Sequence, residues 1–249
     1  MALGAWGLGL GGQPADVQVA AAVSLTEALQ EIAAAAEKQQ RIRVTLNLAA
    51  SNVLARQIVS GSGADVFISA DAAQMDVVAK EGLIRQRVDL LVNQLVVAVR
   101  SDSKVALASE TDLTKPGVRR IAIGDPAGVP AGVYAKQFLE KAGLWRRLES
   151  KIVPTASVRA ALAALESGDV DAAMVYRTDL GIARSVRAAF PPLPEPRVLY
   201  PAALLSATPH AARFFEYLRS PAAAAIFRRH GFGSVACNED RVPEAVKAA

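Results

Sequence analysis

Short apolar runs alternate with segments of helical periodicity from Asp16 onward. In each helical segment, apolar side chains recur every three or four positions, as Leu25, Ala28 and Leu29 do in the first. Three successive pairs of a strand and a helix predict a parallel sheet covered by helices. The three pairs of strand and helix fall at 17–22 and 24–39, at 42–48 and 52–61, and at 64–70 and 71–82.

A second group of strands and helices follows the apolar run 94–100 and a polar connector. The proline-rich segment 191–196 separates this group from one more apolar run and two closing helices, at 210–220 and 221–231. We therefore predict an α/β fold of two lobes, each a mainly parallel sheet flanked by helices. The second group comprises strands at 119–124, 151–154 and 171–176, helices at 131–143 and 158–168, and a further helix after residue 176.

The two predicted lobes are connected twice, near 94–100 and near 197–205. Because the closing helices are too few to form a third domain, we expect them to return to the first lobe. Two connections between two lobes imply a hinged cleft, which is where α/β proteins of this kind bind a ligand. The predicted division is a leader at 1–15, lobe I at 16–95 and 199–249, and lobe II at 96–198.

Composition and charge are those of a folded domain. Of the 249 residues, 52% are hydrophobic and 21% are charged, and the basic residues behind the net charge of +4 are scattered along the chain. That distribution gives no support to nucleic-acid binding. Cys237 is the single cysteine, and His210 and His230 are the two histidines. Neither an intrachain disulfide nor a Cys/His zinc cluster can therefore be assembled.

Common enzyme motifs are missing from the sequence. It has no G-x-S-x-G nucleophile elbow, no G-x-x-x-x-G-K-[ST] phosphate loop, no G-x-G-x-x-G after a strand and no H-E-x-x-H. Both histidines lie in or beside the closing helices, so a Ser-His-Asp triad would require one of them to reach a serine in the cleft. These absences favour a binding protein over an enzyme.

The first 15 residues, MALGAWGLGLGGQPA, carry no charge and resemble the end of a signal peptide. The basic start and leucine-rich centre of a complete signal are missing, and an ordinary disordered leader is the alternative. No later stretch reaches about 18 apolar residues, so the sequence predicts no membrane span.

Two serines stand where a predicted strand gives way to a helix. Ser24 begins the S-L-T-E sequence, which has the form of a capping box with Glu27, and Ser51 begins the second helix in the same way. Either serine alone is explained as a helix cap. Together they indicate an anion site, because parallel strands bring both helix starts, with their free N–H groups, to one edge of the sheet.

The second lobe offers a matching set of donors. Pro130, Ala131 and Gly132 open one helix with backbone N–H groups that no bulky side chain covers. Val158 lies at the start of another helix, and Tyr176 ends a strand with a phenol that can donate. A simple helix-start turn and a half-buried core tyrosine remain the alternatives for Gly132 and Tyr176. Across a cleft, these groups and the two serines would form a cage of neutral donors.

From Asp16 to Phe232 the sequence resembles the periplasmic molybdate-binding proteins of bacterial ABC transporters. Six segments carry this resemblance in the same order and spacing, and GDP-x-x-VPAG-x-YAK is the most specific of them. They are AAAVSLTEAL, LAASNVLARQI, GADVFISAD, GDPAGVPAGVYAK, ASVRAALAALESGDVDAAMVY and FFEYLRSPAAAAIFRRHGF.

The resemblance implies a type II periplasmic-binding-protein-like fold that holds molybdate or tungstate between its lobes. It also implies delivery to an inner-membrane permease with its cytoplasmic ATPase, a periplasmic monomer, and a membrane anchor if the native leader is a lipoprotein signal. No cofactor is implied, and molybdenum is the one metal, bound as the oxyanion. By motif, the ligand-binding residues are Ser24, Ser51, Ala131, Val158 and Tyr176.

Two features depart from the family pattern. The family often has two or three consecutive serines where this chain has Ala50, Ser51 and Asn52, so Asn52 could supply a different contact. Residues 233–249 extend past the usual end. A receptor for another oxyanion or a small organic acid is the first alternative function. A ligand-sensing domain of a transcription regulator and an enzyme on the same fold are the others, and residues 1–16 cannot supply the DNA-binding helices that the former requires.

Overall fold

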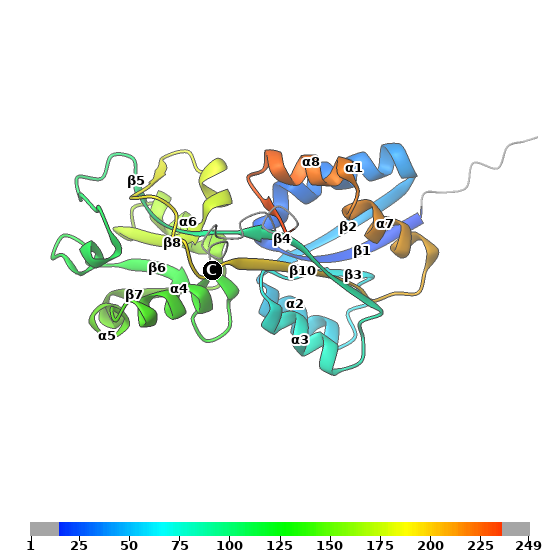
Figure 1. Ribbon diagram of the computed structural model, residues 1–249, viewed down its shortest axis with the longest axis horizontal. Coiled ribbons are helices and arrows are strands. Elements are labelled where there is room, and N and C mark those ends of the chain that lie inside the picture. The colour runs from blue at the N-terminus through cyan, green and yellow to red at the C-terminus, as the bar shows by residue number, and fades with distance from the viewer. Residues whose placement is uncertain (1–14, 236–249) are drawn as a thin grey trace, which may run out of the picture.

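A computed structural model describes residues 15–235, which form two β-sheets with helices packed on both faces of each (Figure 1). The predicted leader, except Ala15, lies outside the described residues, as do Cys237 and residues 236–249 of the C-terminal extension. Within the described part of the chain, no helix is both long and apolar enough to cross a bilayer. The α/β architecture with two lobes that the sequence predicts is confirmed.

The first sheet contains the three strand and helix pairs at the start of the chain. Strands β2, β1 and β3 are parallel neighbours, and the last residues of β1 and β2, Ala22 and Ala49, lie opposite each other. In spatial order its strands are β11 (Gly233–Ser234), β4 (Gln86–Asn93), β10 (Val198–Leu204), β3 (Val66–Ile68), β1 (Ala15–Ala22) and β2 (Ile42–Ala49). Its helices are α1 (Thr26–Gln40), α7 (Pro209–Leu218) and α8 (Pro221–Arg229) on one face, and α2 (Ser51–Val59) and α3 (Ala72–Lys80) on the other (Figure 1).

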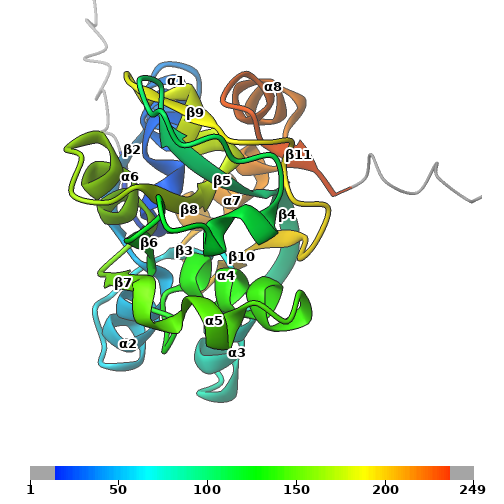
Figure 2. The same ribbon diagram turned by 90° about the vertical axis from the view of Figure 1, so that its left-hand side faces the viewer.

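The second sheet is built from the middle of the chain. Its three parallel strands, β7, β6 and β8, again precede helices or turns at their carboxyl ends. Figure 2, which views the molecule from this end, shows α6 on one side of the sheet and α4 with α5 on the other. The strands in spatial order are β7 (Ile152–Thr155), β6 (Ile121–Gly124), β8 (Ala172–Tyr176), β5 (Leu95–Arg100) and β9 (Val186–Ala188). The helices are α4 (Pro130–Lys141), α5 (Trp145–Leu148) and α6 (Val158–Glu166).

Both sheets are mixed, which corrects the prediction that each is mainly parallel. The sequence pattern does not predict β4, which carries the chain out of the first sheet and pairs antiparallel with β10, the strand that brings it back. In the second sheet, β5 pairs antiparallel with both β8 and β9. The physical reason is that one strand must leave each lobe and another must return, so the crossing strands run in opposite directions.

One predicted helix is also wrong. After β8 the chain forms a short 3-10 helix, η4 (Arg177–Gly181), and then β9, instead of an α-helix. This turn keeps the residues after Tyr176 close to the strand end, because the side chain of Asp179 accepts a hydrogen bond from the backbone N–H of Tyr176 at 2.9 Å. The turn therefore belongs to the region where the two lobes meet.

Helix α4 packs against the end of β6 so closely that Gly132 leaves no room for a side chain. A Cβ atom at Gly132 would lie 1.8 Å from the carbonyl oxygen of Gly124 and 2.8 Å from the carbonyl carbon of Asp125. Real carbon atoms cannot approach that closely, so the helix could accept a side chain here only by moving away from the strand. Gly132 is thus required by close packing, which fixes where Ala131 presents its backbone.

We predict that Gly132→Ala destabilises the protein by about 1–3 kcal/mol or more, because the added methyl group overpacks a rigid contact between backbone segments. Urea denaturation monitored by circular dichroism measures the change. Gly181→Ala is the matched control, since a Cβ atom there meets nothing within 4 Å. Equal stability of the two variants would contradict the packing argument.

Candidate functional site

A small cavity of about 20 Å³ lies where the two lobes meet, and all five residues predicted to bind the ligand line it. On the side of the first sheet, its wall follows the ends of β1, β2 and β3. On the side of the second sheet, it follows the starts of α4 and α6 and the end of β8. The lining residues are Ala22, Val23, Ser24, Ala49, Ala50, Ser51, Ala70, Val129, Pro130, Ala131, Ser157, Val158 and Tyr176.

Ser24 is held by a partner from the other end of the chain. It is buried in a short 3-10 helix, η1 (Val23–Leu25), and its hydroxyl lies 2.9 Å from the phenol oxygen of Tyr200. Asn93 donates to that same phenol oxygen at 3.4 Å. Either hydroxyl can donate in the pair of Ser24 and Tyr200; when Tyr200 donates, the oxygen of Ser24 accepts and its own hydrogen can point into the cavity.

The capping box predicted at Ser24 is wrong. The residue before α1 is Leu25, no side chain caps that helix, and Glu27 instead pairs with Arg159 of the second lobe. The physical reason is that η1 separates Ser24 from the first N–H groups of α1, so that its hydroxyl turns toward Tyr200. Ser24 therefore does not cap α1, which was the alternative explanation of its position.

Ser51 also differs from the predicted helix cap. It is the first residue of α2, the preceding Ala50 occupies the cap position, and no side chain caps the helix. The Ser51 hydroxyl oxygen accepts a hydrogen bond from the backbone N–H of Ala70 at 2.9 Å. Since this bond uses the oxygen as acceptor, the hydroxyl hydrogen of this buried residue can point into the cavity.

The second lobe contributes backbone donors from two helix starts. Pro130 is the first residue of α4, followed by Ala131, and Val158 is the first residue of α6, where the side chain of Ser157 caps the N–H of Ala160. The N–H groups in the first turn of a helix have no partner within that helix. Ala131 and Val158 are both buried, so their free N–H groups need a partner other than bulk water.

Tyr176 carries a buried phenol for which the described part of the chain provides no hydrogen-bond partner. Its ring meets the ring of Tyr200 edge to face, with centroids 6.0 Å apart. Burial raises the pKa of Tyr176 well above its ordinary value, and the nearby Tyr200, Tyr134, Asp71 and Asp179 act in the same direction. The phenol is therefore protonated and has a hydrogen to donate.

The cavity is lined by hydrogen-bond donors and no charges. None of the described residues that line it is Asp, Glu, Lys, Arg or His. Across the described residues, no group of three or more His, Cys, Asp or Glu side chains could hold a metal cation. The site suits a small anion that offers several acceptor oxygens, because each donor then gains a charge-assisted bond.

Comparison with known proteins agrees with this geometry. Residues 17–233 match the family model described as bacterial extracellular solute-binding protein. The chain is also 40% identical over 228 residues to the molybdate-binding protein ModA of Escherichia coli (strain K12), covering 87% of this chain and 88% of that protein. The chain belongs to the bacterial extracellular solute-binding protein family and, within it, to the molybdate-binding ModA proteins. The resemblance that the sequence motifs indicate is thereby confirmed, and the family is one of solute-binding proteins and not of enzymes.

Two solved structures of anion-binding proteins share the fold. The periplasmic molybdate-binding protein of Azotobacter vinelandii superposes with a TM-score of 0.77 at 24% identity, covering 87% of this chain and 98% of that one. The sulfate-binding protein SubI of Mycobacterium tuberculosis H37Rv superposes with a TM-score of 0.75 at 15% identity, covering 89% and 87%. At these identities the superpositions show that the chain has the fold of this family's receptors and no more.

Several residues that support the family's predicted site are not apparent from the sequence. Tyr200 and Asn93 orient the hydroxyl of Ser24, and Thr178 accepts a hydrogen bond from Asn93 at 2.9 Å. Asp179 holds the backbone of Tyr176. Two signals in the sequence could have found them. Tyr200 lies within the apolar run RVLYPAALL, and Asn93 directly follows the apolar residues of β4. Polar groups in such runs need partners when they are buried.

We predict that Tyr176→Phe leaves the stability of the anion-free protein unchanged or raises it by up to about 1 kcal/mol, because it removes a buried hydroxyl without a partner. Tyr200→Phe is the matched control and should lower stability by about 1–2 kcal/mol, since its hydroxyl bonds Ser24 and Asn93. Thermal unfolding in anion-free buffer compares the two. Equal destabilisation would mean that the Tyr176 phenol is already satisfied.

Proposed function

We propose that this protein binds molybdate, and also tungstate, in the cavity between its lobes and delivers it to the permease of an ABC transporter. The observation that carries the proposal is the composition of the cavity wall: helix starts and hydroxyl groups from both lobes, with no charged side chain among its described residues. The 40% identical relative is named a molybdate-binding protein, which supports the choice of anion.

Five groups would hold the oxyanion. The hydroxyls of Ser24 and Ser51 donate from the first lobe, and the backbone N–H groups of Ala131 and Val158 and the phenol of Tyr176 donate from the second. Because the donors come from both lobes, they can reach one small anion together only when the cleft is closed. Anion binding and lobe closure would then be one event.

The negative charge of the anion would be balanced by dipoles. Helices α2, α4 and α6 all begin at the cavity, and the amino end of a helix carries a partial positive charge with unpaired N–H groups. Such fixed dipoles need no reorganisation when the anion enters. They also accept no proton, so the site favours an oxyanion that is fully deprotonated near neutral pH.

The size of the cavity argues against an organic ligand. Pockets that hold small organic molecules usually enclose about 300–1,000 Å³. The cavity between the lobes measures about 20 Å³, far below that range, and is too small for a carbon skeleton. This favours a tetrahedral oxyanion over the small organic acid that the sequence left open.

The setting that this function implies is outside the cytoplasm. The matched family is described as extracellular, and we propose that this member is periplasmic and acts as a monomer. A lipid anchor would follow if the native leader is a lipoprotein signal. The partner would be the inner-membrane permease with its cytoplasmic ATPase.

Ser24→Ala and Ser51→Ala should each weaken molybdate binding about ten- to a hundredfold, because a hydrogen bond to a charged acceptor contributes about 1.5–3 kcal/mol. Isothermal titration calorimetry with molybdate measures the change. Ser220→Ala removes a helix-capping hydroxyl on α8, away from the cavity, and should leave affinity unchanged. Wild-type affinity in both cavity variants would remove these serines from the site.

Sulfate and phosphate should bind at least about a thousandfold more weakly than molybdate and tungstate. The sulfur–oxygen bond is shorter than the molybdenum–oxygen bond, so a rigid cage of the larger size would lose about two good hydrogen bonds to sulfate. Phosphate carries a proton that the donors cannot accept. Competition titration tests this, and displacement of molybdate by sulfate at near-equal concentration would identify a general oxyanion receptor instead.

A further inference from the structure

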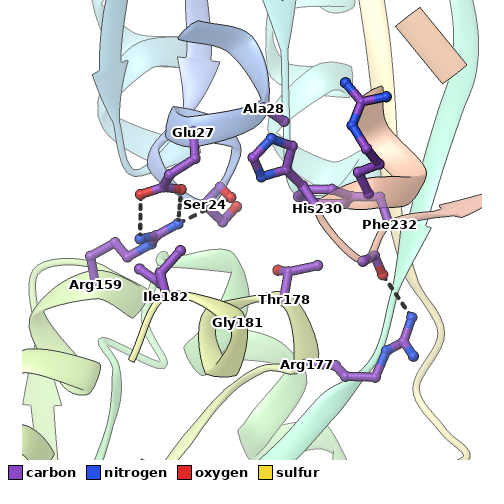
Figure 3. Close-up of a pocket in the computed structure, with 12 residues that line it drawn as sticks. Ser24, Glu27, Ala28, Arg159, Arg177, Thr178, Gly181, Ile182, His230 and Phe232 are labelled. Atoms are coloured by element: carbon purple, nitrogen blue, oxygen red, sulfur yellow. Dashed lines mark hydrogen bonds and ion pairs between the residues drawn. The ribbon is translucent and has the colours of Figure 1, made fainter. Parts of the chain in front are cut away.

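Arg159 joins the two lobes through a two-pronged ion pair with Glu27. Its Nη1 atom donates to Oε1 of Glu27 at 3.0 Å, and its Nη2 atom donates to Oε2 at 2.7 Å (Figure 3). Glu27 lies in the first turn of α1 in the first lobe, whereas Arg159 lies in the first turn of α6 in the second. The pair must therefore break whenever the lobes separate.

A buried carboxylate holds Arg159 in place from within its own lobe. Asp179 is fully buried, and its Oδ1 atom lies 3.0 Å from Nε of Arg159. Burial raises the pKa of Asp179 to about 6, although the charge of Arg159 opposes that rise. Burial also raises the pKa of Glu27, but its hydrogen bonds with Arg159 bring that pKa below its ordinary value overall. Arg159 is thus preorganised to meet Glu27.

The same arginine is connected to three of the five proposed anion-binding residues. It directly follows Val158, and its Nη2 atom donates to the carbonyl oxygen of Ser24 at 3.3 Å. Through Asp179, whose other oxygen accepts from the N–H of Tyr176, it also supports the end of β8. Arg159 does not line the anion cavity, so it acts through these neighbours.

The ion pair also borders a larger cavity of about 230 Å³ (Figure 3). Ser24 lines both cavities, and Arg159, Glu27, Thr178 and His230 line the larger one. Ser24 is therefore shared by the two cavities, and Arg159 of the ion pair bonds its carbonyl oxygen.

We propose that Glu27 and Arg159 form a latch between the lobes, with Asp179 as its support, that slows release of the bound anion. This inference rests on the proposed anion-binding function and adds to it two positioning residues that do not touch the anion. The latch forms when the lobes are closed and is lost when they open. The latch therefore lowers the rate at which the anion is released and leaves the rate of its capture unchanged.

Another contact between the lobes is simpler and more exposed. Arg177 donates to the carbonyl oxygen of Gly231 at 2.6 Å, which joins η4 to the end of α8. This is one bond from an exposed side chain to a neutral acceptor. The two-pronged pair at Glu27 has charge on both sides and an arginine whose side chain is 18% exposed, so it is the stronger candidate for a latch.

The chain supplies a matched control on the same helix. Glu31 lies one turn after Glu27 on α1 and also forms an ion pair, but with Arg229 of α8, which belongs to the same lobe. Its other oxygen lies 2.9 Å from Nε2 of His230, the residue that follows α8. Glu31→Gln removes an acidic group and an ion pair just as Glu27→Gln does. Only Glu27→Gln removes one that spans the two lobes.

The experiment measures release of labelled molybdate after a chase with excess unlabelled molybdate, and association by rapid mixing, for the wild-type protein and both variants. Glu27→Gln should release molybdate about tenfold faster with an association rate within about twofold of wild type. Glu31→Gln should match the wild type in both rates. Thermal unfolding without anion verifies that the two variants are folded.

Three results would overturn the latch. Unchanged release from Glu27→Gln would mean that the ion pair does not hold the lobes together. Equally faster release from both variants would assign the effect to the charge of α1 and not to the contact between lobes. If the wild-type protein bound no molybdate at all, the proposed function would be overturned, and the latch with it. In the other two results the protein binds molybdate and only the latch is overturned.

Discussion

The gathering of hydrogen-bond donors at one cavity between the lobes is the constraint on which this structure depends. Parallel strands of both sheets end at that cavity, and each end delivers a helix start, a hydroxyl or a phenol. A buried donor without a partner, such as the Tyr176 phenol, is unfavourable, and an acceptor bound between the lobes would remove that cost. The rest of the fold holds these donors in fixed positions, with or without a bound acceptor.

That holding is done by groups that are themselves polar and buried. Asn93 ends the first crossing strand, contacts Thr178 in the second lobe and contacts Tyr200 on the returning strand, which in turn bonds Ser24. One network therefore links the point where the lobes are connected to a proposed anion donor. Because an imperfectly satisfied buried network is unfavourable, this one restricts the position of the Ser24 hydroxyl more tightly than apolar packing alone would.

Local patterns in the sequence were enough to predict most of the helices and parallel strands and the five residues that meet at the cavity. They were not enough for contacts between distant segments. Ser24 and Tyr200 are 176 residues apart, and Glu27 and Arg159 are 132 apart. The predicted capping box at Ser24 and Glu27 failed for this reason: both side chains satisfy a local rule, yet each finds its partner in a remote segment. Strand β4 was missed because its exposed polar residues interrupt the apolar pattern that the other strands keep.

The separation of charge from the binding cavity has a physical consequence of its own. An arginine inside the cavity would attract sulfate, phosphate and molybdate alike, since a point charge discriminates poorly among small anions. Here Arg159 is outside the cavity and is already neutralised by Glu27 and Asp179. In the proposed site the anion would be held by dipoles whose positions are set by helix packing, such as the contact that excludes any side chain at Gly132. The site can then select among anions by the length of their bonds to oxygen, because no positive side chain in the cavity attracts them all. The charge of Arg159 serves instead to hold the two lobes together.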